Sequence, residues 1–317
     1  MTTLIGETIF HQIPTENGFT LIRAAVYSGS QLAVMTEEEV LVSDCEDASW
    51  RVELTIPSDH AKFVALFRET HGSRTGVVVL EDGAITAHSI GDRSQQRVAL
   101  GWSSSTRFVL AEGMSEAWLL SQDEDALCVY PLHQHKPTRV FKNVFQDSRL
   151  ALSSAVVHGS QITFLILEDR RDESIFSRIA MIDLATGSLL KGEQVDWHIR
   201  CIALLPSGVC LVGGEKGLFS CVVGDEGSIS HLIPELEWES GHRNGSMVAL
   251  NVSNERIVAL AEVEDGVTQP VLYQRQKRGP WQQSSLDFDD YIYGSLIYNS
   301  HLVVFSSVLL KKFPLQS

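Results

Sequence analysis

Clusters of carboxylates recur along the 317-residue chain, and they are the side chains best suited to do chemistry. The densest are Glu37-Glu38-Glu39 and Asp123-Glu124-Asp125. Two carboxylates at a suitable separation can hydrolyse a glycosidic bond, whereas many on one surface attract a cationic partner. Because such clusters are frequent here, none of them singles out a catalytic centre.

Other catalytic patterns are missing from the sequence. The 11 histidines are scattered without the spacing of a helical metal site, and no Gly-x-Ser-x-Gly nucleophile motif occurs. No acidic loop alternates Asp and Gly as a calcium loop does. Residues 213–217 (Gly-Gly-Glu-Lys-Gly) are expected to form a hairpin turn, since no helix follows them to hold a phosphate. We therefore expect no catalytic residue, no metal and no cofactor.

The cysteines and the apolar segments indicate in which cellular compartment the protein is expected. The odd number of cysteines, none in a C-x-x-C pair, favours reduced and buried thiols at Cys45, Cys128, Cys201, Cys210 and Cys221. No apolar run reaches about 18 residues, and the first residues lack the basic and apolar regions of a secretory signal. We expect a cytoplasmic protein, or a nuclear one in a eukaryote, without membrane contact.

The elements that must position the carboxylates are short apolar strands joined by tight turns. The clearest repeat aligns residues 28–32 (Ser-Gly-Ser-Gln-Leu) with residues 158–162 (His-Gly-Ser-Gln-Ile). The same junction between two strands returns near Gly72, Gly113, Gly208, Asn254 and Asn299. The spacing averages about 45 residues, the length of a four-stranded propeller blade. We predict an all-β fold, a seven-bladed β-propeller.

The predicted propeller is a single domain over residues 1–317. Its blades are expected at about 18–57, 58–100, 101–145, 146–195, 196–236, 237–288 and 289–317 plus 7–13. The last repeat has only three strands of its own. Residues 7–13 alternate in polarity and are predicted to supply its outer strand, which closes the ring. Small residues in the predicted inner strands, such as Ala65, Ala155 and Ala249, suit the crowded axis.

The repeat resembles that of the β-propeller superfamily, including the WD40-like propellers. Residues 183–187 (Asp-Leu-Ala-Thr-Gly) resemble the D-x-x-T-G turn that joins outer strands in many propellers. No Trp-Asp dipeptide ends a third strand, so the hydrogen-bond relay of true WD40 repeats is not expected. The resemblance covers the whole chain and implies a scaffold rather than a particular activity.

Charge is distributed unevenly among the predicted loops. The chain has 40 acidic residues against 25 Lys and Arg, a net charge of −15. In a propeller, the turns between second and third strands (b–c turns) share one face with the connections between blades. We call this the b–c face, and well over half of the acids fall there. Basic residues concentrate instead on the turns between third and fourth strands: Arg93, Arg97, His133, His135, Lys136, Arg139, Lys191, Arg275, Lys277, Arg278, Lys311 and Lys312.

An acidic b–c face would attract a basic protein and repel nucleic acid. The alternative is that turns are simply where solvated Asp and Glu occur. Aromatic residues also recur at the blade-to-blade connections: Trp102, Phe145, Trp197, Trp238 and Phe288. They are either wedges between blades or anchors for a partner, and the exposure of Trp197 and Trp238 would distinguish the two roles.

The prediction is therefore a non-enzymatic protein-interaction module, an adaptor, scaffold or inhibitor subunit of a hetero-complex. The alternative is a carbohydrate-active propeller enzyme with an acidic axial pocket. The predicted partner-binding residues are Glu37, Glu38, Asp82, Asp123, Glu124, Asp125, Glu168, Asp169, Glu215, Trp197 and Trp238.

Overall fold

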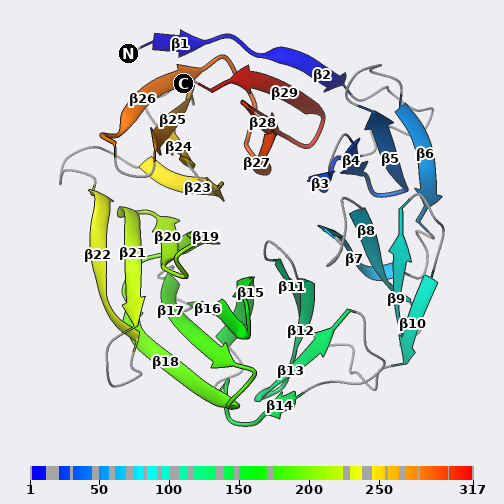
Figure 1. Cartoon of the computed structure of the whole chain (residues 1–317), viewed down its shortest axis with the longest axis vertical. Coiled ribbons are helices and arrows are strands. Elements are labelled where there is room, and N and C mark those ends of the chain that lie inside the picture. The colour runs from blue at the N-terminus through cyan, green and yellow to red at the C-terminus, as the bar shows by residue number, and fades with distance from the viewer. Residues whose placement is uncertain are drawn as a thin grey trace.

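A computed structural model of the chain contains strands arranged as sheets around a central axis (Figure 1). It describes residues 2–11, 21–28, 31–44, 50–56, 61–68, 75–81, 84–90, 95–99, 107–112, 117–132, 139–145, 150–169, 175–223, 229–237, 245–253, 256–263, 269–276, 279–298 and 300–315. The only regular secondary structure in these ranges is β-strand. Within them, no helix has the length and apolar character needed to span a membrane.

Two sheets at the start of the ring are four-stranded antiparallel meanders. They consist of β3 (Ala24–Ser28), β4 (Gln31–Met35), β5 (Glu39–Asp44) and β6 (Trp50–Thr55), then β7 (Ala61–Arg68), β8 (Thr75–Glu81), β9 (Ala84–Ser89) and β10 (Gln95–Ala99). A third such meander consists of β19 (Ile199–Leu204), β20 (Cys210–Gly214), β21 (Gly217–Val223) and β22 (Ile229–Glu237). Each begins with the strand nearest the axis, as the repeat predicted.

An eight-stranded sheet lies between β10 and β19 and combines two meanders. They are β11 (Arg107–Glu112), β12 (Ala117–Asp123), β13 (Ala126–Pro131) and β14 (Arg139–Phe141), then β15 (Leu150–His158), β16 (Gln161–Asp169), β17 (Ile175–Asp183) and β18 (Ser188–Val195). The inner strands β11 and β15 pair in parallel at Ala111 and Ala155, whose small side chains allow the close approach. The described residues thus form six hydrogen-bonded sheets, and the sheet count alone does not give seven.

The last two sheets both include N-terminal strands. One consists of β23 (Gly245–Val252), β24 (Arg256–Val263), β25 (Gln269–Gln276), β26 (Gln282–Leu286) and β1 (Thr2–Leu4), the other of β27 (Gly294–Tyr298), β28 (His301–Phe305), β29 (Leu309–Pro314) and β2 (Glu7–His11). The antiparallel pairing of β2 with β29 confirms the predicted outer strand. The parallel pairing of β1 with β26 was not predicted.

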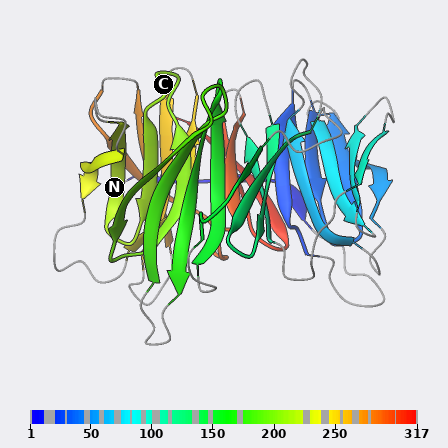
Figure 2. The ribbon, with the colours of Figure 1, turned by 90° about the horizontal axis from the view of Figure 1, so that it is seen from below.

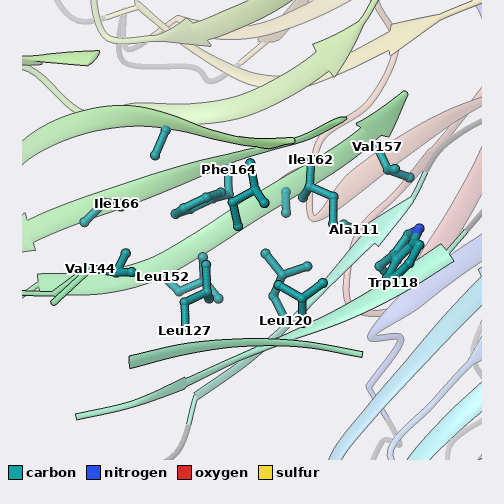
Figure 3. Packing of buried hydrophobic residues seen from close by; sticks show 14 of the residues in the cluster. Ala111, Trp118, Leu120, Leu127, Val144, Leu152, Val157, Ile162, Phe164 and Ile166 are labelled. Carbon is teal, nitrogen blue, oxygen red and sulfur yellow. The ribbon is translucent and has the colours of Figure 1, made fainter. Parts of the chain in front are cut away.

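The core lies between neighbouring sheets. Figure 3 shows this for the two meanders of the eight-stranded sheet, where Leu120 and Leu127 from one meet Leu152, Ile162 and Phe164 from the other. All five side chains are buried. The alternating apolar positions of each strand therefore hold adjacent sheets together. The strands run between two opposite sides of the ring (Figure 2).

Gly214, at the end of β20, provides a stability prediction. A Cβ there would lie 2.1 Å from the backbone oxygen of His198 and 2.8 Å from Trp197. We expect Gly214→Ala to lower the free energy of unfolding by about 2–3 kcal/mol, because backbone atoms must move. Gly279→Ala is the control, since its nearest neighbour lies 3.8 Å away, and should change stability by less than about 0.5 kcal/mol. Equal urea midpoints for the two variants would contradict the packing described.

Candidate functional site

Backbone hydrogen bonds fasten the blade-to-blade connections against the b–c turns. After β6, Ile56 N donates to the carbonyl oxygen of Glu38 at 2.6 Å. After β14, Val144 N donates to the carbonyl oxygen of Asp125 at 2.8 Å. The acidic turns and the connections therefore share one end of the sheets, and their backbones are held in place.

The turn between β4 and β5 owes its geometry to a hydroxyl group rather than to its acids. Thr36 Oγ1 accepts hydrogen bonds from the backbone N–H groups two and three residues further on, at 3.3 and 3.0 Å. Ser306, between β28 and β29, does the same at 3.2 and 3.1 Å. Uncharged residues take the places of Glu37 and Glu38 in that second turn. Turn formation therefore does not require carboxylates at these two positions.

Five of the predicted acidic residues are exposed at b–c turns: Glu37, Glu38, Glu124, Asp125 and Glu215. Asp123, at the end of β12, is half-buried. Glu168 and Asp169 end β16, but their side chains lie outside the described residues, as does the whole of Asp82. Two of the exposed carboxylates have partners of their own. Glu37 forms an ion pair with Arg23, and Glu215 accepts a hydrogen bond from His198 N at 3.1 Å.

At the opposite ends of the strands, the described connections contain no charged residue. They are residues 90, 132, 159–160, 184–187, 205–209, 253, 279–281 and 300. Several cations expected in turns lie inside strands instead and have acidic partners. Lys312 Nζ lies 3.0 Å from Glu7, and Arg275 Nη1 lies 2.8 Å from Glu235. The prediction of basic turns is thus wrong for these residues, because neighbouring strands supply the opposite charge.

The prediction that Trp197 binds a partner is wrong, because this residue is buried. Its side chain is only 5% exposed and packs on Phe219 with ring centroids 5.3 Å apart. Phe145 and Phe288, at equivalent connections, are also buried. These aromatics are wedges between sheets, because an apolar ring at the end of an outer strand gains most by covering the neighbouring core. Trp238 and Trp102 lie outside the described residues.

Two exposed tyrosines that are not among the predicted partner-binding residues lie on the b–c face. Tyr291 and Tyr293 are 70% and 54% exposed, in the connection between β26 and β27. Ile292, which lies between them, and Phe288, which precedes them, are buried. Both tyrosines precede the inner strand of this blade, because β27 begins at Gly294. The available signal was the adjoining pair of aspartates at 289–290, which is unusual at the start of a buried strand.

The backbone of this tyrosine segment is held at three points. Asp287 N donates to Leu4 O at 2.9 Å, and Tyr293 N donates to Phe305 O at 2.9 Å. Between them, Ile292 N donates to the Glu262 carboxylate at 3.1 Å. The two phenol rings are therefore presented from a fixed backbone, which lowers the entropy lost when a partner covers them.

The cysteines of the fifth repeat are poor nucleophiles. Burial raises the pKa of the Cys201 thiol to about 12 and that of Cys221 to about 11. Burial also raises the pKa of Cys210, which lies opposite Cys221 in the sheet. Since the thiolate is the reactive form, these side chains remain inert near neutral pH. All three are free thiols, as is Cys128, while Cys45 lies outside the described residues.

The turn predicted at residues 183–187 is confirmed. Asp183 Oδ1 accepts a hydrogen bond from Ala185 N at 2.8 Å, and Gly187 has a positive φ of 79°. Hydrogen bonds, first that from Ala185 N, lower the pKa of Asp183. This carboxylate is therefore a turn residue. Elsewhere in the described part of the chain, no three His, Cys, Asp or Glu side chains gather as metal ligands would.

Comparison with known proteins identifies the fold. No protein-family profile and no curated protein sequence matches the chain. Among solved structures, a streptogramin B lyase is 13% identical with a TM-score of 0.63, covering 98% of this chain and 97% of its own. YCF48 from Cyanidioschyzon merolae is 11% identical with a TM-score of 0.64 and 98% coverage of both chains. Catalytically inactive virginiamycin B lyase from Staphylococcus aureus with quinupristin is 10% identical with a TM-score of 0.64, covering 96% and 98%.

These likenesses show a β-propeller fold and nothing finer, because the identities are so low. Two of the three proteins are lyases, so the same scaffold supports catalysis as well as binding. The absence of catalysis in this chain thus stays a prediction.

Proposed function

We propose that this chain is a seven-bladed propeller that binds a basic protein through its b–c face, as a non-enzymatic subunit of a hetero-complex. Counting the two meanders of the eight-stranded sheet as separate blades gives the seven. The observation that carries the function is the position of the exposed charges. Carboxylates occupy three of the four b–c turns that the structure describes, and the fourth, at residues 306–308, is uncharged. Lys216 is the one cation in these four turns, and it is paired with Asp196 at 2.9 Å.

Two further observations support a docking role over simple turn preference. The turn at Thr36 needs its hydroxyl and not its acids, since Ser306 forms the same turn without them. Tyr291 and Tyr293 place large exposed rings beside Asp289. A tyrosine ring and a carboxylate together suit Lys or Arg, because the ring face attracts the cation while the carboxylate pairs with it.

The partner is accordingly a protein with an exposed Lys- or Arg-rich patch. Its association should be steered by long-range attraction to the −15 net charge and should weaken as salt is added. Nucleic acid and membranes would not be direct partners of this face, since phosphates carry the same sign of charge. The proposed site of action is the cytoplasm, or the nucleus in a eukaryote.

Affinity purification from the source cells tests this proposal with two variants of equal charge. The first, Glu38→Gln with Glu124→Gln and Asp125→Asn, removes three exposed acids from the b–c turns. The second, Ala185→Lys with Ser207→Lys and Ser300→Lys, adds three positive charges at exposed positions on the opposite side. Each change makes the net charge more positive by three.

We expect the first variant to bind its partner about tenfold more weakly, at roughly 0.5 kcal/mol per surface charge. The second variant should bind like the unaltered protein, and moderate salt should elute the partner. Equal recovery of the partner with the unaltered protein and both variants would refute the acidic docking face. Recovery that salt does not affect would refute it as well. Circular dichroism and melting temperatures establish that all three are folded.

A further inference from the structure

A cavity of about 200 Å³ lies at the end of the β23–β26 sheet that is opposite to its b–c turn. It is formed where β24 begins, β25 ends and β26 begins. The lining residues are Arg256, Gln274, Arg275, Gln276, Gln282 and the turn at Gly279 and Pro280. This volume is more than ten times the space needed for one water molecule, yet it is below the range of drug-sized pockets. It suits a small molecule.

The described side chains at the cavity carry a net positive charge. Arg275 is paired with Glu235 at 2.8 Å, and its guanidinium carbon lies 4.7 Å from the centroid of the Trp281 ring. These two contacts fix the guanidinium plane before any ligand binds. Arg256 has no ion pair with another described residue. One positive charge at the cavity is thus uncompensated by described side chains.

Unpaired polar atoms concentrate beside the cavity. Six buried side-chain nitrogen or oxygen atoms of the described residues lack a hydrogen-bond partner, and three belong to Gln274, Arg275 and Trp281. Gln274 is only 3% exposed and donates to Gln282 at 3.3 Å, which leaves its carbonyl oxygen unpaired. A buried unpaired group of this kind costs about 1–3 kcal/mol. A ligand that supplies both acceptors and donors would offset that cost.

We propose that this cavity binds a small hydroxylated oxyanion, a sugar acid or a sugar phosphate. The anionic group would pair with Arg256 and Arg275, since guanidinium groups bind carboxylates and phosphates through two parallel hydrogen bonds. The hydroxyls would bind the glutamine amides, which offer both donors and acceptors, and would donate to Gln274. This site is independent of the docking face, because it lies at the other end of the strands.

Calorimetric titration of the full chain tests the site with named probes. Gluconate represents the carboxylate, glucose 6-phosphate the phosphate, sorbitol the uncharged polyol and inorganic phosphate the bare anion. We expect gluconate or glucose 6-phosphate to bind with a Kd below about 1 mM, and at least ten times tighter than sorbitol or inorganic phosphate. Whichever of these two anions binds more tightly shows whether the site prefers a carboxylate or a phosphate.

Arg256→Gln should weaken that binding at least tenfold, and Arg256→Lys should weaken it less, since charge is kept and the planar fork is lost. Arg200→Gln, at an exposed position on β19, is the control and should bind like the unaltered protein. Equal binding of all four probes, no binding of either sugar anion up to about 10 mM, or equal losses for Arg256→Gln and Arg200→Gln would overturn the proposal. The variant with Glu38→Gln, Glu124→Gln and Asp125→Asn should bind the sugar anion normally, so failure of this proposal and failure of the docking face are separate results.

Discussion

Replacement of Trp197 by alanine is expected to lower the free energy of unfolding by about 3–5 kcal/mol. The indole is 5% exposed and lies in a cluster with Phe219, Ile199 and Val212, so its loss leaves a cavity between two sheets. Urea denaturation followed by tryptophan fluorescence and circular dichroism measures the change. The folded fraction of this variant should still bind the partner, because the ring is not on the surface.

Tyr291→Ala is the matched variant for which we expect the opposite pattern, a loss of partner affinity without a loss of stability. Its side chain is 70% exposed, so stability should change by less than about 0.5 kcal/mol, while partner affinity should fall about tenfold or more, as for an exposed aromatic anchor. Tyr291→Phe should keep most of that affinity if the ring face is what binds. A stable Trp197→Ala protein that has lost its partner would reverse the two assignments and restore Trp197 as an anchor.

Deletion of residues 2–11 is expected to lower the free energy of unfolding by about 4–6 kcal/mol, a large part of the usual total. The deletion removes β1 and β2, whose Leu4, Ile9 and Phe10 pack on two separate cores, and partial burial of each is worth about 1.5–2 kcal/mol. It also leaves the edges of β26 and β29 unpaired, which favours association between molecules.

Denaturation midpoints and size-exclusion chromatography at several protein concentrations measure both effects. A point-mutant pair separates packing from chain length. Leu4→Asp should destabilise, because Leu4 packs on the core around Phe288, whereas Ile5→Asp should not, because Ile5 is 77% exposed. A shortened chain that unfolds at the same urea concentration as the full one would show that β1 and β2 do not stabilise the ring.

The local part of the fold could be predicted from the sequence, because hairpins depend on residues that are close together in the chain. The Asp183 turn and the small residues of the inner strands, such as Ala155, were predictable from residue type alone. The partner of β2 was predictable because the last repeat lacked a strand. By contrast, β1 is three residues long and pairs in parallel with a strand some 280 residues away, so no periodic pattern could mark it.

The predicted site was harder to place, because the residues that decide exposure are distant in sequence. Trp197 has the same neighbours in the chain whether it is a wedge or an anchor, and only its contact with Phe219 decides. Tyr291 and Tyr293 alternate with an apolar residue as a strand would. Hydrogen bonds from this segment to Glu262 and Leu4 hold it outside the sheet instead.

The N-terminal strands also set an order for biosynthesis. The ribosome makes β2 about 300 residues before β29, and at 5–20 residues per second this interval takes about 15–60 s. Until then the nascent chain carries Ile9 and Phe10 without their final neighbours, and the ring cannot close. Chaperone contact with β2 during translation should therefore persist until β29 has left the ribosome.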